Sequence, residues 1–283
     1  MRLFIFGYGF SARALSARLR PQGWEIAASV REPARMEGQM RAEGVTPVAA
    51  ADPDALAAAL VTADAVLVTA PPTARGCPGL SALAPVIGGP KWIGYLSTTG
   101  VYGDRQGGWV SETSALAARS IEGARRVGAE RDWGLFGRDR RLAVSIFRLP
   151  GIYGPGRSSL DRLRTGQARR IVSPGQVFSR LHVDDLAAGL EASIALPRPD
   201  AIYNLCDDQP AANSEVIAYA AGLLGMAPPP EVSLEDAGLT GPARRFYAES
   251  KRVSNARAKA ELGWRPAYPT YREGLAAVLA AGG

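Results

Sequence analysis

A glycine-rich segment near the start of the chain has residue types and a spacing suited to holding a phosphate. The sequence Gly-Tyr-Gly-Phe-Ser-Ala over residues 7–12 follows an apolar run, Leu3–Phe6, and precedes a segment with helical periodicity. Gly7 permits a tight turn, Gly9 lets backbone N–H groups approach a pyrophosphate, and the small Ala12 lets the helix pack on the strand. The helix N-terminus then stabilises the phosphate charge. The segment predicts a dinucleotide site, with a ligand-free glycine turn as the alternative. The predicted contacts are Gly7, Gly9, Phe10, Ser11 and Ala12.

Strand-like and helical segments alternate along the rest of the chain. The strand-like runs are 3–6, 25–30, 45–48, 65–69, 92–96, 144–148 and 202–205. Such alternation predicts an α/β fold, a Rossmann-type doubly wound parallel sheet with helices on both faces. We expect residues 1–150 to form the NAD(P)-binding domain, with its sheet completed by about 180–206. Residues 151–179 and 207–283 are expected to form a small C-terminal substrate lobe.

Composition favours an ordinary enzyme over a nucleic-acid-binding or membrane protein. The net charge is +6, but the arginines are scattered among acidic residues and no aromatic platform accompanies them. Cys77 and Cys206 lie far apart and His182 is the single histidine, so neither a disulfide framework nor a metal site is predicted. No run reaches the roughly 18 apolar residues of a membrane span. We expect a cytoplasmic protein with a small-molecule substrate, no nucleic-acid or membrane partner, and a possible homodimer.

Five sequence blocks in order carry a resemblance to a known family. They are Gly-Tyr-Gly-Phe-Ser-Ala at 7–12, Leu-Ser-Thr-Thr-Gly-Val-Tyr-Gly-Asp at 96–104, Arg-Leu-Pro-Gly-Ile-Tyr-Gly-Pro-Gly at 148–156, Leu-His-Val-Asp-Asp at 181–185 and Glu-Leu-Gly-Trp-Arg-Pro at 261–266. With them the chain resembles an extended or atypical short-chain dehydrogenase/reductase of the NAD-dependent epimerase/dehydratase type.

The resemblance implies positions for the cofactor and for one catalytic hydroxyl. Thr98 stands where the family places a Ser or Thr that bonds the substrate oxygen; the alternative is a threonine that only satisfies the strand end. Segment 69–71 is implied to line the adenosine and pyrophosphate side, and segment 150–152 to pass beside the nicotinamide. The cofactor residues implied in this way are Thr69, Ala70, Pro71, Ser97, Pro150, Gly151 and Ile152.

The sequence departs from the family at its usual catalytic Tyr-x-x-x-Lys pair. No tyrosine lies between 102 and 153, and no lysine lies between 91 and 251. Glu122 and Arg126 occupy the corresponding positions. They are either an i,i+4 ion pair or an active-site pair, in which Glu122 handles a proton and Arg126 bonds the nicotinamide ribose. Tyr153 is a further candidate, because its phenol could reach the cleft from the opposite wall.

The end of the second strand bears on the choice of nucleotide. NAD-specific folds place an acidic residue there to bond the ribose 2′-OH. This chain has Ser29 and Arg31, followed by Arg35, and these residues suit a 2′-phosphate. We therefore expect NADP, with NAD less favoured; Glu32 is the residue that argues for NAD.

The second lobe supplies candidate substrate contacts. Phe178 stands where nucleotide-sugar members of the family place a diphosphate-binding arginine, which argues against a sugar nucleotide, although Arg180 lies close by. The segment 243–252 is rich in cations and is expected over the cleft or, alternatively, in a solvated turn. Its substrate candidates are Arg244 and Tyr247.

The block at 181–185 is expected to serve the scaffold. His182 is interpreted as a structural residue near the sheet edge. Asp184 and Asp185 are expected to cap a helix that begins at Leu186.

These observations predict an oxidoreductase or epimerase that acts on a small carbonyl or hydroxyl substrate. The alternative is a catalytically inactive NADP(H)-binding sensor or regulatory protein. An exposed apolar patch over the cleft would favour the sensor.

Overall fold

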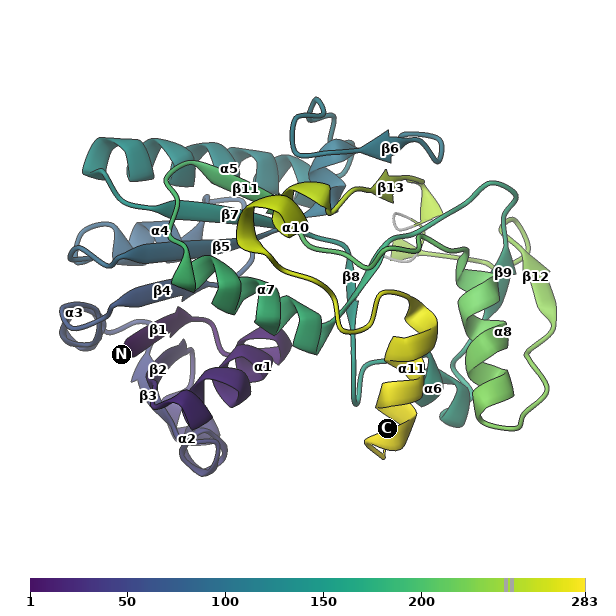
Figure 1. Cartoon of the computed structure of the whole chain (residues 1–283), viewed down its shortest axis with the longest axis horizontal. Coiled ribbons are helices and arrows are strands. Elements are labelled where there is room, and N and C mark those ends of the chain that lie inside the picture. The colour runs from purple at the N-terminus through teal and green to yellow at the C-terminus, as the bar shows by residue number, and fades with distance from the viewer. Residues whose placement is uncertain (242–243, 245–246, 283) are drawn as a thin grey trace.

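A seven-stranded parallel sheet forms the centre of the larger part of the molecule (Figure 1). The computed structural model describes residues 1–241, 244 and 247–282. The strand order is β11-β7-β5-β4-β1-β2-β3. The strands are β1 (Arg2–Phe6), β2 (Glu25–Val30), β3 (Val45–Ala49), β4 (Ala65–Val68), β5 (Trp92–Thr98), β7 (Val144–Leu149) and β11 (Ala201–Asn204). All seven expected runs join this sheet, so the predicted fold class is confirmed.

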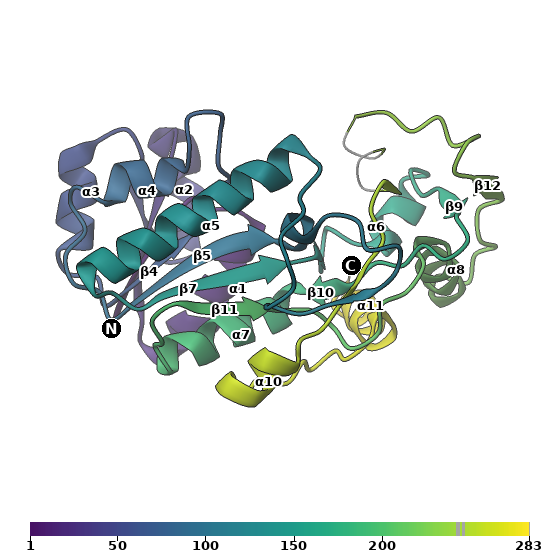
Figure 2. The same ribbon diagram turned by 90° about the horizontal axis from the view of Figure 1, so that it is seen from above.

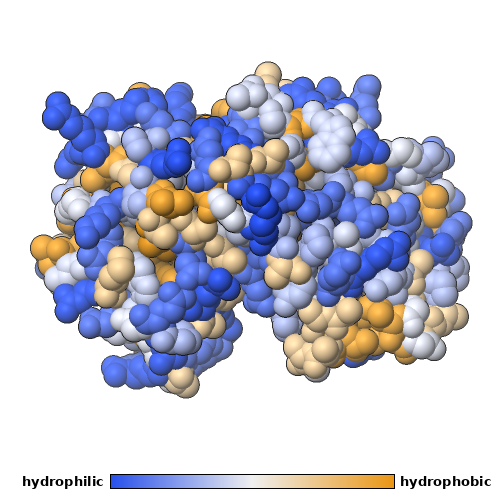
Figure 3. All heavy atoms as spheres, in the orientation of Figure 1, coloured by the Kyte–Doolittle hydropathy of each residue, from blue (hydrophilic) through white to orange (hydrophobic). Residues whose placement is uncertain are grey.

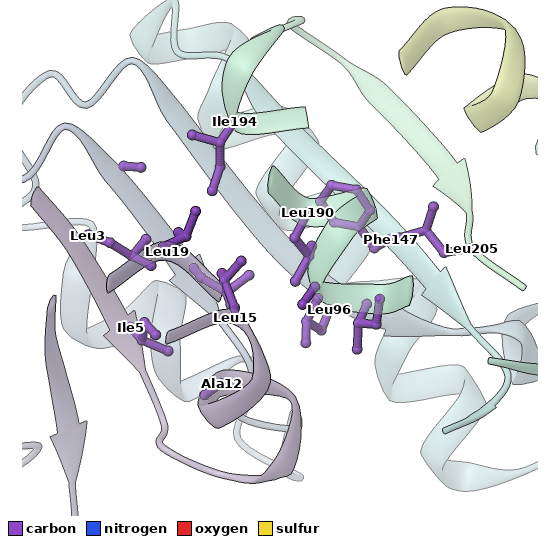
Figure 4. Close-up of a cluster of buried hydrophobic side chains, with 14 of the residues drawn as sticks. Leu3, Ile5, Ala12, Leu15, Leu19, Leu96, Phe147, Leu190, Ile194 and Leu205 are labelled. Atoms are coloured by element: carbon purple, nitrogen blue, oxygen red, sulfur yellow. The ribbon is translucent and has the colours of Figure 1, made fainter. Parts of the chain in front are cut away.

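Helices cover both faces of the sheet, as Figure 2 shows. Side chains alternate along β1, so that Leu3 and Ile5 enter one apolar cluster and Phe4 and Phe6 enter the other. The first cluster, shown in Figure 4, also includes Leu15 and Leu190. Its helices are α1 (Phe10–Leu19), α2 (Pro33–Ala42), α7 (Val183–Ala195) and α10 (Ala256–Leu262). The opposite face carries α3 (Pro53–Leu60), α4 (Pro78–Leu83) and α5 (Ile121–Arg140).

A smaller lobe with its own apolar cluster lies beside the carboxyl ends of the strands. Its helices are α6 (Ser159–Arg164), α8 (Asn213–Leu223) and α11 (Tyr271–Ala280). Short parallel strand pairs complete the fold: β8 (Gly151–Tyr153) with β10 (Arg180–His182), β9 (Arg170–Val172) with β12 (Glu231–Ser233), and β6 (Trp109–Val110) with β13 (Arg252–Val253). Two short 3₁₀ helices span Arg20–Gln22 and Thr99–Tyr102. The face in Figure 3 is largely hydrophilic, with apolar atoms gathered at the lower right, from the lower end of α11 toward that of α8.

The start of α7 differs from the prediction. The helix begins at Val183, three residues earlier than expected, and its cap is His182, whose Nδ1 accepts the N–H of Asp184 at 3.2 Å. Asp185 instead accepts hydrogen bonds from the backbone N–H groups of residues 267 and 268. The expected caps were therefore wrong, because Asp185 faces the C-terminal segment.

No helix in the described part of the chain combines the length and apolarity that a membrane crossing needs. The described residues also contain no group of three or more His, Cys, Asp or Glu side chains arranged to hold a metal ion.

Candidate functional site

The loop after β1 has the geometry of a phosphate cradle. Gly7 has φ +95°, and a Cβ there would lie 2.8 Å from the hydroxyl oxygen of Thr69. That hydroxyl donates to the Gly7 carbonyl at 2.7 Å, which ties the loops after β1 and β4 together at the sheet's switch point. Gly9 caps α1 without a side-chain hydrogen bond, and a Cβ there would meet nothing within 4 Å. The residues therefore fit a dinucleotide phosphate.

Some of the other predicted cofactor contacts are buried and support the glycine loop, whereas others are exposed to solvent. Ala12 is buried against the core. Ser29 is 1% exposed, and its hydroxyl accepts the N–H of Gly7 at 3.2 Å, so it holds the glycine loop in place. Arg31 and Arg35 are exposed just beyond β2, which leaves them available to a phosphate. Phe10, Ser11, Thr69 and Ala70 are half-buried, and Pro71 is exposed.

A cavity of about 540 Å³ lies at the carboxyl ends of β5 and β7. Its volume is within the range of small-molecule sites. Among the predicted residues it brings together Thr98, Glu122, Pro150 and Gly151. Its other described wall residues are Thr99, Gly100, Ser120, Val177, Phe178, Ser179, Glu249, Lys251 and Val253.

Local structure positions the two polar candidates on the cavity wall. Thr98 ends β5, and its hydroxyl oxygen accepts the N–H of Gly100 at 3.1 Å. Its own O–H can therefore still donate to a ligand. Glu122 is exposed in the first turn of α5, where Ser120 caps the helix by accepting the N–H of Gly123 at 3.0 Å.

Arg126, one turn further along α5, lies against the end of β5. It donates to the Tyr95 hydroxyl at 3.2 Å and to the Leu96 carbonyl, and its guanidinium carbon lies 5.6 Å from the Tyr95 ring centroid. Burial raises the pKa of Tyr95 to about 12. Helix α5 contains neither a tyrosine nor a lysine.

A buried ion pair joins the carboxyl ends of β5 and β7 to α5. Arg148 donates to Glu130 from Nε and from Nη2, the latter at 2.8 Å, and the two side chains are 4% and 5% exposed. Ser97, a predicted cofactor residue, is buried and donates to Glu130 at 2.5 Å. Sequence reasoning missed this pair, because its partners lie 18 residues apart on different elements.

The same arginine extends the network toward the sheet edge. Its Nη1 donates to the Tyr102 hydroxyl at 3.0 Å and to the Glu112 carbonyl at 3.1 Å. Tyr102 in turn donates to Asn204 Oδ1 at 2.7 Å. All three guanidinium nitrogens of Arg148 thus donate to groups that hold the strand ends together.

The structure places Tyr153 away from the cavity. Its hydroxyl is buried with no hydrogen-bond partner among the described residues, and a Cβ on Gly274 would lie 1.8 Å from it. Its ring lies edge-on to His182. Burial raises the pKa of the phenol far above its usual range. The expectation that Tyr153 reaches the cleft was wrong, because the chain turns its side chain toward α11. The adjacent Ile152 is half-buried against the core.

The predicted substrate contacts of the second lobe also lie outside the described cavity wall. Arg180 donates to the carbonyls of Phe178 and Ala211 at 2.9 and 3.0 Å, so it braces two loops. Tyr247 accepts a hydrogen bond from Asn213 at 3.0 Å, and Arg244 is exposed. Ala243, Arg245 and Phe246 of the same predicted stretch lie outside the described residues.

The segment 243–252 nevertheless contributes to the wall through two residues that the sequence did not single out. Lys251 and Glu249 line the cavity and form an ion pair at 2.5 Å. One sequence feature could have drawn attention to Lys251: lysine is scarce, and Lys251 is one of three in the chain.

Comparisons with known proteins place the chain among proteins of this fold. No family model matches it. It is 46% identical to a functionally unknown conserved protein from Silicibacter pomeroyi, with a TM-score of 0.90 over 99% of this chain and 98% of that one. It is also 30% identical over 143 residues to a 3-diazoavenalumate denitrifying reductase from Streptomyces, which covers 47% of this chain and 46% of that protein. The match thus spans about half the length of the curated relative.

More distant structures share the whole fold. A dTDP-glucose 4,6-dehydratase from Bacillus anthracis in complex with NAD has a TM-score of 0.80 at 17% identity, over 99% of this chain and 96% of that one. A human epimerase family protein with NADPH has a TM-score of 0.77 at 19% identity, over 98% of each chain. The chain therefore belongs to one family with the Silicibacter pomeroyi protein and has the Rossmann fold of the NAD-dependent epimerases and dehydratases of the short-chain dehydrogenase/reductase superfamily.

Proposed function

We propose that this protein uses NADP(H) to oxidise, reduce or epimerise a small carbonyl or hydroxyl substrate. The observation that carries the proposal is the cavity at the ends of β5 and β7, which brings Thr98 and Glu122 together beside segment 150–151. In a doubly wound sheet, ligands bind at this edge.

The nucleotide would lie across the carboxyl edge of the sheet. The loop at 7–12 would hold the pyrophosphate, and Arg31 with Arg35 would bind a 2′-phosphate. When bound, the nicotinamide supplies or accepts a hydride. The absence of an acid at position 31, together with the exposure of both arginines, supports NADP over NAD.

Thr98 and Glu122 would handle the oxygen and the proton of the substrate. Thr98 can donate its O–H to a carbonyl oxygen, because the hydrogen bond from the N–H of Gly100 uses a lone pair of the hydroxyl and not its proton. Glu122 would give a proton to that oxygen in reduction and take it back in oxidation. Arg126 would hold the α5 side of the site against β5.

The partial likeness to a reductase from Streptomyces supports reduction as the direction to test first. The purified protein is mixed with NADPH and a panel of aldehydes, ketones and 2-oxo acids, and loss of NADPH fluorescence is followed. We expect Thr98→Val to lower kcat about 10–100-fold and Thr98→Ser to retain most of it.

The alternative function, a nucleotide sensor, gives a different pattern in the same experiment. Tight NADPH binding without turnover of any panel member would contradict the enzyme and support the sensor. Equal kcat for wild type and Thr98→Val would remove Thr98 from the mechanism.

A further inference from the structure

The cavity has a cationic group on the wall that the C-terminal segment contributes. Lys251 directly precedes β13 and lines the cavity together with Glu249. Strand β5 and helix α5 contribute other wall residues, Thr98 and Glu122. We propose that Lys251 binds a carboxylate of the substrate, so that the substrate is a small organic acid with an apolar body. This inference rests on the proposed function, because it names the substrate class for the same cavity.

The backbone around Lys251 is held firmly. The N–H of Ser250 donates to Asp104 at 2.9 Å, and its hydroxyl accepts the N–H of Val177 at 3.1 Å. Gln176 donates to the Glu249 carbonyl at 2.9 Å. These bonds tie the segment to loops of both lobes, so Lys251 is presented to the cavity from a fixed backbone. Such preorganisation lowers the entropic cost of binding a ligand.

The ammonium of Lys251 has capacity for a second anion. A lysine has three N–H donors, and within the described part of the chain its hydrogen-bond partner is Glu249. Its side chain is 11% exposed and that of Glu249 is 15% exposed, so both groups are largely shielded yet open to the cavity. A substrate carboxylate can therefore join or replace that of Glu249 on the ammonium.

The rest of the wall selects the size and charge of the ligand. Lys251 is the one cation among the described wall residues, and Glu122 and Glu249 are acidic. One ammonium suits one carboxylate, whereas a diphosphate calls for several cations. Val177, Phe178 and Val253 supply apolar surface, against which an alkyl or aryl body can pack.

Benzoate and its neutral isostere benzamide test the inference in the presence of saturating NADP⁺. Their affinities are measured by calorimetry for the full chain and for three variants. We expect the wild type to prefer benzoate. Lys251→Met should weaken benzoate about tenfold or more and change benzamide less than about twofold, because only benzoate carries the charge.

Glu249→Gln provides the second arm, with an effect of opposite sign. Removal of the competing Glu249 carboxylate should raise the affinity for benzoate several-fold. If the ion pair were merely structural, both Glu249→Gln and Lys251→Met would bind benzoate more weakly. Lys259→Met is the matched control, because Lys259 forms a similar pair with Asp208 outside the described wall. It should leave both affinities unchanged.

Two outcomes would overturn the inference. The first is equal affinity of the wild type for benzoate and benzamide, which includes no measurable binding of either. The second is an unchanged benzoate affinity in Lys251→Met. NADP⁺ binding is titrated separately in each protein. If the wild type does not bind NADP⁺, the proposed function is refuted. If it binds NADP⁺ but its benzoate affinity does not depend on Lys251, only the carboxylate site is refuted.

Discussion

The Arg148–Glu130 and Lys251–Glu249 pairs both lie near the carboxyl ends of β5 and β7, but the first pair is buried beside the cavity wall residues and only the second pair lines the cavity. Arg148 donates to Glu130, Tyr102 and a backbone carbonyl, and its side chain is 4% exposed. Lys251 contacts Glu249 on the wall of a 540 Å³ cavity. The difference teaches that a buried charge bonded through all three of its nitrogens holds the fold together, while a charge with unused donors beside a cavity can recognise a ligand.

Removal of one partner from each pair should give the largest contrast. Arg148→Met leaves the buried Glu130 carboxylate without its cation, and we expect a loss of about 3–5 kcal/mol in the free energy of unfolding. Lys251→Met leaves Glu249 beside a cavity that water can enter, and we expect a loss of no more than about 1 kcal/mol. Urea unfolding of the two variants and the wild type measures both values. Similar losses for both would break the comparison.

A third acid, Asp207, extends the comparison to a buried carboxyl group with few hydrogen-bond partners. Its Oδ1 accepts the N–H of Arg180 at 3.4 Å, and its Oδ2 has no partner among the described residues. Burial raises its pKa to about 8, whereas the unfolded carboxyl loses its proton near a pKa of about 3.9. Between these values the folded state holds one more proton, so stability falls as the pH rises toward 8.

Asp207→Asn should remove this pH dependence. We expect the variant to exceed the wild type in unfolding free energy by about 1–3 kcal/mol at pH 8–9, and the gain to shrink at pH 5. Thermal unfolding across pH measures the difference. A constant difference between the two proteins from pH 5 to pH 9 would show that the carboxyl titrates normally.

Tyr102→Phe makes a smaller change to the Arg148 network. The hydroxyl bridges Arg148 and Asn204 Oδ1, and its loss leaves two buried polar groups with one partner fewer. We expect a cost of about 1–2 kcal/mol in urea unfolding. In the Arg148→Met background the same change should cost less, because one of its bonds is already gone. Equal costs in both backgrounds would show that Tyr102 and Arg148 act independently.

The sequence was sufficient for the sheet and the glycine loop because their signals are local. The loop at 7–12 directly follows the apolar run of β1, and each predicted strand is a short stretch rich in apolar residues. Thr98 was placed in the cleft because it lies within the block at 96–104, and Glu122 because it occupies the position of the family's tyrosine; both line the cavity.

Long-range contacts explain what the sequence did not reveal. Ser29 turns toward Gly7, and Tyr153 turns toward Gly274, which lies on a helix far along the chain. Arg180 was chosen for its charge, yet its Nη1 donates to two backbone carbonyls. The side-chain direction at such positions depends on tertiary packing, which the order of residues along the chain does not display.

Titration calorimetry with NADPH and NADH tests the central claim, that the carboxyl edge of the sheet binds NADP(H). We predict that NADPH binds at least about tenfold more tightly than NADH, and that Arg31→Ala removes most of this preference while NADH affinity is kept. Arg41→Ala is the control, because Arg41 pairs with Glu37 on the exposed face of α2. Equal affinity for the two nucleotides would contradict the 2′-phosphate site, and binding of neither would contradict the account as a whole.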